Sequence, residues 1–237
     1  IDANSRVSLS NNGSFDSGTS NTVFGKSIGD IDAGSNYNVF IGEDVASGGT
    51  LADAANNVVV GYQAAEGITT ADSSVMIGYQ AGQEHSQGSG FTAIGYRAGY
   101  DGSGHDNWGN TFIGYESGSG NWAGGSNGNV GVGYETLTGA MNDADYNTAV
   151  GYQCGLSITL GDKNTLLGYK AGVSLTEGTI NVAIGNSALL AGTTNHQNVA
   201  IGGQALTNTT SDSNVAIGEK SGLSNTSGTF NVAVGRA

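Results

Sequence analysis

Three histidines and one cysteine are the side chains of this sequence best suited to acid–base, nucleophilic or metal chemistry. His85, His105 and His196 have no cysteine and no pair of carboxylates at ligand spacing beside them. Cys154 follows a Gly-Tyr-Gln segment, where six similar segments of the chain have alanine, which indicates a small packing residue and not a nucleophile. We therefore expect exposed loop histidines, no catalytic residue, no cofactor and no enzyme activity.

Two short acidic segments have the alternating oxygen ligands that calcium sites use, namely residues 30–36 (DIDAGSN) and residues 143–145 (DAD). Neither completes the twelve-residue, helix-flanked calcium loop or a glycine-rich nonapeptide array. Ordinary acidic turns are the favoured interpretation, and no metal site is predicted. A chelator that leaves the thermal stability unchanged would remove the calcium alternative.

The composition narrows the classes of protein further. Of 237 residues, 42 are glycine, none is proline and 11% are charged, which is unlike an ordinary globular enzyme. A hydrophobic content of 37% with so few charges argues against disorder. Seven basic against twenty acidic residues, a net charge of −13, make nucleic acid a poor partner. No apolar run is long enough to span a membrane, and residues 1–20 lack the pattern of a signal peptide, so export would require a removed signal or another route.

A repeat with a period of about 17 residues occupies nearly the whole chain. Its unit resembles N-[VT]-x-[IV]-G-Y-x-[AS]-G, as in residues 147–155 and 164–172. Residues 1–20 stand apart as an atypical N-terminal coil or cap, and residues 21–237 form one repeat domain. The corner glycines that align the thirteen copies are Gly25, Gly42, Gly61, Gly78, Gly95, Gly114, Gly133, Gly151, Gly168, Gly185, Gly202, Gly218 and Gly235.

The unit predicts an all-β protein, a parallel β-solenoid (β-roll) of about 13 coils. Seventeen residues are too few for a helix pair, and a single coil buries its apolar side chains only by stacking on its neighbours. Each corner glycine is expected at positive φ after a short β-branched strand. Asparagine precedes the glycine by four residues in eleven copies and can stack as an amide ladder.

Each predicted strand is apolar on both faces. We expect the Val or Thr three residues before the glycine and the large apolar residue directly before it to point into the coil. The residue between them, for example Phe40, Met76 or Ala183, then forms an outer stripe that is never charged. A second copy of the chain is the expected cover for this stripe, and loops of the same chain are the alternative.

Aromatic residues supply the candidates for recognition. The only two tryptophans lie in adjacent long spacers, and the candidate receptor-binding residues are Tyr100, His105, Trp108 and Trp122; packing between neighbouring chains is the alternative. Tyrosine follows the corner glycine in seven coils and predicts an aromatic column that either stabilises the stack or offers a platform for sugars. The column consists of Tyr62, Tyr79, Tyr96, Tyr115, Tyr134, Tyr152 and Tyr169.

The segments NVAIGNSA (181–188), NVAIGGQA (198–205) and NVAIGEKS (214–221) resemble the head repeats of trimeric autotransporter adhesins. The longer unit GYKAGVSLTEGTINVAIG (168–185) and the lead-in at residues 5–25 are similar to repeats of phage tail-fibre and adhesin-like proteins. The resemblance implies a left-handed β-roll and three chains about a common axis. The period and the tyrosines depart from the adhesin pattern, and no stalk, anchor or self-cleaving chaperone is recognisable.

Three functions follow as expectations. The first is a non-enzymatic, homotrimeric attachment protein, a phage tail fibre or surface adhesin, outside the cell on a virion or cell surface, with loops that contact a host glycan or protein. The second is a filament or decoration subunit that polymerises end to end, because the sequence ends on a strand and glycine corner that we expect to continue or to stack. The third, an ice-binding solenoid, is disfavoured because only five coils have Thr at the Val/Thr position, which is expected to face inward.

Overall fold

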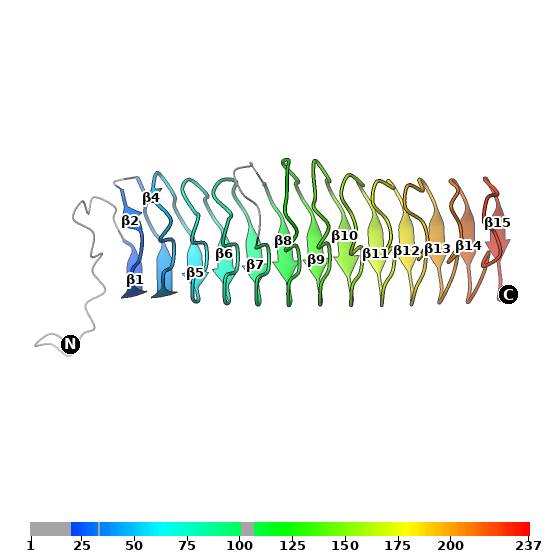
Figure 1. Cartoon of the computed structure of the whole chain (residues 1–237), viewed down its shortest axis with the longest axis horizontal. Helices are drawn as coiled ribbons and strands as arrows, with labels where there is room; N and C mark the ends of the chain where they lie inside the picture. Colours follow the sequence, from blue (N-terminus) through cyan, green and yellow to red (C-terminus); the bar gives the residue numbers. More distant parts are fainter. Residues whose placement is uncertain (1–19, 33, 101–106) are drawn as a thin grey trace, which may run out of the picture.

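Thirteen short strands stack side by side in one parallel sheet that runs the length of the described chain (Figure 1). The computed structural model describes residues 20–32, 34–100 and 107–237. The predicted cap at residues 1–20 therefore lies outside the described residues except for Ser20. The strands of the main sheet are β1 (Thr22–Lys26), β3 (Val39–Glu43), β5 (Val58–Val60), β6 (Val75–Ile77), β7 (Thr92–Ile94), β8 (Thr111–Ile113), β9 (Val130–Val132), β10 (Thr148–Val150), β11 (Thr165–Leu167), β12 (Val182–Ile184), β13 (Val199–Ile201), β14 (Val215–Ile217) and β15 (Val232–Val234).

Each strand pairs with the equivalent strand of the next coil, in the register that the repeat predicts. Thr148 pairs with Thr165 and Ala149 with Leu166, so equivalent positions form straight columns along the stack. A small second sheet of β2 (Asp30–Ile31) and β4 (Thr50–Leu51) follows the same rule. The all-β parallel solenoid with a period of about 17 residues is thus confirmed. No helix in the described part of the chain is long and apolar enough to cross a membrane.

Twelve of the thirteen corner glycines have the positive φ that was predicted for them, and Gly25 of β1 does not. From Gly42 to Gly235 all twelve have φ between +125° and +145°, a region that side chains other than hydrogen rarely tolerate. A Cβ atom at Gly151 would overlap with the backbone oxygen of Gly168 in the next coil. Glycine is required here both by the dihedral angle and by the close stacking of the backbones.

The asparagine ladder is also confirmed, and it lies inside the coil. The backbone N–H of Asn164 donates to Oδ1 of Asn147 at 3.0 Å, and the Nδ2 of Asn164 donates to the backbone oxygen of Gly178 at 2.7 Å. The same pattern repeats at Asn181. These asparagines are fully buried, so each amide satisfies backbone groups that water cannot reach.

The assignment of the two strand faces was wrong: they are reversed. The middle residue of the strand, expected on an outer stripe, points into the coil, and Phe40, Met76 and Ala183 are all 0% exposed. The Val/Thr residue and the residue before the glycine point outward, and none of them is buried. The asparagine and the middle residue are two positions apart and must share a face, but the sequence does not say that this face is the inner one.

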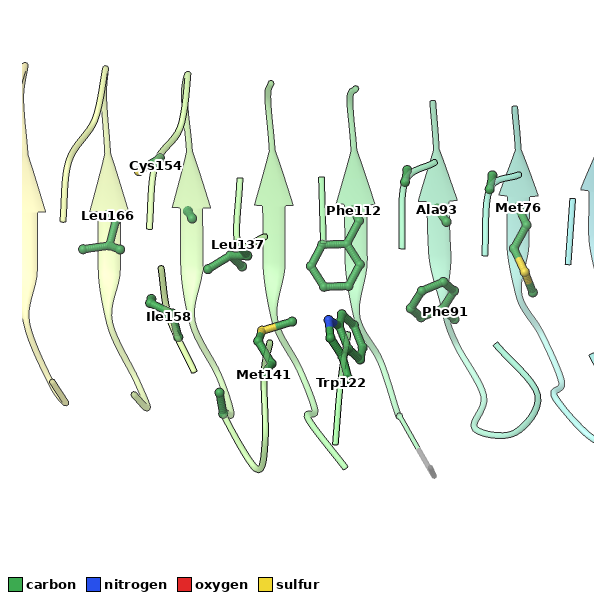
Figure 2. Close-up of a cluster of buried hydrophobic side chains, with 14 of the residues drawn as sticks. Met76, Phe91, Ala93, Phe112, Trp122, Leu137, Met141, Cys154, Ile158 and Leu166 are labelled. Carbon is green, nitrogen blue, oxygen red and sulfur yellow. The ribbon is translucent and has the colours of Figure 1, made fainter. Parts of the chain in front are cut away.

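The interior is filled by middle residues of very different size that compensate one another. Phe112 of β8 is followed in the next coil by Gly131, at which a Cβ atom would lie 2.9 Å from Cδ1 of Phe112. Trp122 packs against the same phenyl ring, with its ring centroid 5.3 Å from that of Phe112 at an interplanar angle of 65° (Figure 2). Irregular size is tolerated inside the coil because neighbouring layers share the space.

Candidate functional site

The outward side chains of the main sheet form a continuous uncharged surface, which we call the outer sheet face. It spans thirteen strands and is about 60 Å long and about 10 Å wide at the usual strand spacings, or about 600 Å². A contiguous patch of this size and composition is typical of an interaction surface. Its two columns are Thr22, Val39, Val58, Val75, Thr92, Thr111, Val130, Thr148, Thr165, Val182, Val199, Val215 and Val232, and Phe24, Ile41, Val60, Ile77, Ile94, Ile113, Val132, Val150, Leu167, Ile184, Ile201, Ile217 and Val234.

The tyrosines that follow the corner glycines stack as one aromatic column. Consecutive ring centroids are 4.9 to 5.5 Å apart with interplanar angles of 4° to 24°, from Tyr62 to Tyr169. Each tyrosine between these two has both ring faces covered by its neighbours, and the exposed parts are the ring edges and hydroxyl groups. A sugar stacks on an open ring face, so this geometry favours stabilisation of the stack over a sugar platform.

Charged side chains flank this column in its middle. A hydrogen bond with Glu135 and partial burial raise the pKa of Tyr134, and burial raises the pKa of Tyr115 beside Glu116. Nη1 of Arg97 lies 3.9 Å from Oε1 of Glu116. The phenols therefore stay protonated near neutral pH and act as hydrogen-bonding groups, not as bases.

The two tryptophans have different environments. Trp122 is 1% exposed, so its proposal as a receptor-binding residue is wrong: the indole packs against Phe112 in the core. Trp108 is 53% exposed, as a recognition residue must be. Tyr100 lies under the guanidinium of Arg97, with Cζ 3.8 Å from the ring centroid. His105 lies outside the described residues.

His85 is not the exposed loop residue that was predicted. It is 0% exposed, and its ring stacks on Phe91 with centroids 4.1 Å apart and an angle of 11°. Neither ring nitrogen has a hydrogen-bond partner. Burial lowers the pKa of His85 to about 4, and the nearby backbone of Gly88, which does not meet hydrogen-bond geometry, acts in the opposite direction. The imidazole therefore serves as a neutral core side chain.

His196 and Cys154 also have structural roles. His196 is half-buried, and its Nδ1 lies 3.1 Å from the backbone nitrogen of Thr179, which donates to it. Cys154 is fully buried in the alanine position, and burial raises the pKa of its thiol to about 12. The interpretation of Cys154 as a packing residue is confirmed.

Asp32 and Asp145 of the two acidic segments accept hydrogen bonds from the backbone, including that of a neighbouring coil. Oδ1 of Asp32 accepts hydrogen bonds from the N–H groups of Gly34, Ser35 and Asp53 and from the Ser35 hydroxyl. Desolvation opposes ionisation most strongly, but these hydrogen bonds outweigh it and lower the pKa of Asp32. Within the described residues, no three histidine, cysteine or carboxylate side chains gather in a way that could hold a metal ion.

A second ladder of side-chain hydrogen bonds, which was not predicted from the sequence, runs along the position six residues before the corner glycine. Oδ1 of Asp145 accepts the N–H of Asn127 at 2.7 Å, and Oδ1 of Asp162 accepts the N–H of Asp145 at 2.8 Å. Asp212 does the same for His196. The signal was the frequent occurrence of Asp, Asn, Ser and His at this position. Several of the acidic residues are thus structural acceptors.

The next residue, five before the glycine, forms a corner that we call the outer corner. It has φ between +54° and +70° in all thirteen coils, although only three of its residues are glycine. Four of its side chains are large and strongly exposed: Tyr37 (62%), Tyr146 (60%), Ile180 (53%) and Phe230 (81%). The outer corner is occupied by Ser20, Tyr37, Asn56, Ser73, Gly90, Gly109, Gly128, Tyr146, Lys163, Ile180, Gln197, Ser213 and Phe230.

Comparison with known proteins does not extend these observations. The chain matches no protein-family model, no curated protein and no solved structure.

Proposed function

We propose that this chain is a non-enzymatic fibre segment that associates side by side with copies of itself, as a homotrimer, in an extracellular attachment structure such as a phage tail fibre or a surface adhesin. The outer sheet face is the single observation that carries the proposal. Its 26 side chains are Val, Thr or large apolar residues and include no charge, whereas the chain as a whole has a net charge of −13.

A copy of the same chain is the partner that fits this face best. The outer columns hold one residue type or its close equivalent on every strand, while the inner column varies from Gly131 to Phe112. Side chains that repeat at a strand spacing of about 4.8 Å pack well against a surface with the same spacing. A parallel copy of this chain has that spacing because it has the same coils. Two such faces in contact would bury about 1,200 Å², the size of a stable specific interface.

The trimer, the attachment role and the extracellular location rest on the resemblance to adhesin and tail-fibre repeats. The geometry is compatible with that role, because a stack of thirteen hydrogen-bonded coils is a straight, stiff rod (Figure 1). A surplus of acidic groups keeps such a rod soluble. A host glycan or protein is the proposed receptor, without nucleic acid and without membrane insertion.

The oligomer can be tested with a matched pair of substitutions. Leu167 on the outer sheet face and Leu160 in a spacer are 46% and 44% exposed. Sedimentation equilibrium of the wild-type chain should give three times the monomer mass. Leu167→Lys should lower the association constant at least about a hundredfold, because three ammonium groups must be desolvated at one level of the interface, while Leu160→Lys should have no effect. A wild-type monomer at high micromolar concentration would refute the proposal.

A filament or decoration subunit that polymerises end to end is the second candidate, favoured by the parallel stacking itself, which can continue from one chain into the next. Electron microscopy of negatively stained protein separates the two. Discrete rods about 60 Å long support the side-by-side trimer, and long filaments support end-to-end growth.

A further inference from the structure

We propose that Trp108, Tyr146 and the glycine corners between them form a binding site for a pyranose sugar. This inference rests on the proposed attachment function and names the class of receptor for it. Trp108 lies directly before the outer corner of one coil, and Tyr146 occupies the outer corner two coils further along the stack. At the usual strand spacing the two residues are about 10 Å apart along the stack.

The space between the two aromatic residues has no side chains at the outer corner. Gly90, Gly109 and Gly128 occupy three successive coils there, while every other coil has a side chain at this position. A Cβ atom at Gly109 would have no neighbour within 4 Å, so this corner is open. The ring of Tyr146 covers Gly128, where a Cβ atom would lie 2.7 Å from its Cδ1. The result is an open shelf at Gly109 with an aromatic ring on one side and the exposed indole of Trp108 beside it.

The shelf also has a rigid backbone and nearby polar groups. The N–H of Trp108 donates to Oδ1 of Asn127 at 2.8 Å, and the N–H of Gly128 donates to the backbone oxygen of Trp108 at 2.9 Å. Asp145 continues the same ladder beside Tyr146. The backbone that carries Trp108 and faces Tyr146 is therefore held in place, and the Asp145 carboxylate and the Tyr146 phenol lie on the neighbouring coil.

These features favour a sugar over an apolar or an anionic ligand. An indole that is 53% exposed and a phenol ring that is 60% exposed offer flat apolar surface to the C–H face of a pyranose. The Tyr146 hydroxyl and the second carboxylate oxygen of Asp145 are the polar groups that would bond the sugar hydroxyl groups. The Asn127 amide is already used within the ladder, because its Oδ1 accepts the N–H of Trp108 and its Nδ2 donates to Oδ1 of Asp145 at 3.4 Å. An anionic ligand would be repelled by Asp145 and by the net charge of −13.

Fluorescence offers a direct test, because the chain has two tryptophans and Trp122 is buried. Acrylamide quenching then reports mainly on Trp108. The methyl pyranosides of mannose, galactose, glucose and N-acetylglucosamine at millimolar concentration, and an immobilised glycan array, are the probes. We expect at least one pyranoside to protect Trp108 from quenching. Trp108→Ala should abolish retention on the array, and Gly109→Gln should weaken it about tenfold, because the new side chain fills the shelf.

Matched controls keep the test specific. Gly109→Gln uses a residue that the outer corner already accepts at Gln197 with φ 58°. Tyr37→Ala removes an equally exposed outer-corner tyrosine away from the shelf and should leave binding unchanged, whereas Tyr146→Ala should weaken it. Rods without affinity for any sugar of the panel would overturn this inference and leave the proposed fibre standing. A change of oligomeric state in Trp108→Ala or Tyr146→Ala would also overturn it, because the rings would then belong to a contact between chains.

Discussion

Acidification to pH 5 should loosen the coils around His85 while leaving distant coils closed. The imidazole is buried against Phe91, and no charged group is among the causes that lower its pKa to about 4. In the unfolded chain the pKa of histidine is about 6.5. The folded pKa is thus below the unfolded pKa, so the contribution of His85 to stability is complete above pH 6.5 and is lost as the pH falls through 4.

The magnitude follows from proton linkage. A pKa difference of about 2.5 corresponds to about 3 kcal/mol at pH values below both pKa values, and about 2 kcal/mol of this is already lost at pH 5. A loss of about 2 kcal/mol raises the opening equilibrium about thirtyfold. Most carboxylates remain ionised at pH 5, so the interval from pH 7.5 to 5 isolates the histidine.

Hydrogen exchange with mass spectrometry is the suitable assay, because long repeat stacks need not unfold in one step. After correction for the intrinsic pH dependence of exchange, peptides over residues 73–95 should lose protection at pH 5, and peptides over residues 147–168, which contain no partner of a histidine, should not. In His85→Met, which keeps an apolar side chain that cannot titrate, the pH effect should disappear. In His196→Gln the effect should persist. An unchanged pH effect in His85→Met, or a measured His85 pKa near 6.5, would refute the reasoning.

Three further outcomes test the fold. Asn164→Ala should lower the free energy of unfolding by about 2–4 kcal/mol in denaturant titrations, because the N–H of Asn181 and the backbone oxygen of Gly178 lose buried partners. Gly151→Ala should yield little soluble protein, since its φ is 142°, whereas Gly203→Ala meets no atom within 4 Å and should express normally. Cys154 should not react with a thiol reagent until the chain unfolds, because the thiol is buried and its pKa is about 12; rapid native labelling would contradict its place in the core.

Local and periodic features were predictable because each coil repeats them. Glycine at a period of about 17 residues requires a corner, and the asparagine four residues earlier predicts the ladder that Asn147, Asn164 and Asn181 form. The tyrosine column follows from the same period, since equivalent residues of successive coils must lie above one another. Translation of one coil along the stack is enough to derive these features without knowledge of the interior.

The sequence by itself determined that the chain is a stack of parallel coils, where the corners lie and which residues share a column. Only the tertiary structure decided which face of each strand is inside, because both faces are apolar and a shift of one residue exchanges them. It also separated the two tryptophans: Trp122 is buried against Phe112 inside the coil, and Trp108 stays exposed. The physical reason is the same in both cases. An apolar side chain is stabilised when it is removed from water. The shape of the closed coil determines whether its own chain or a partner chain shields it from water.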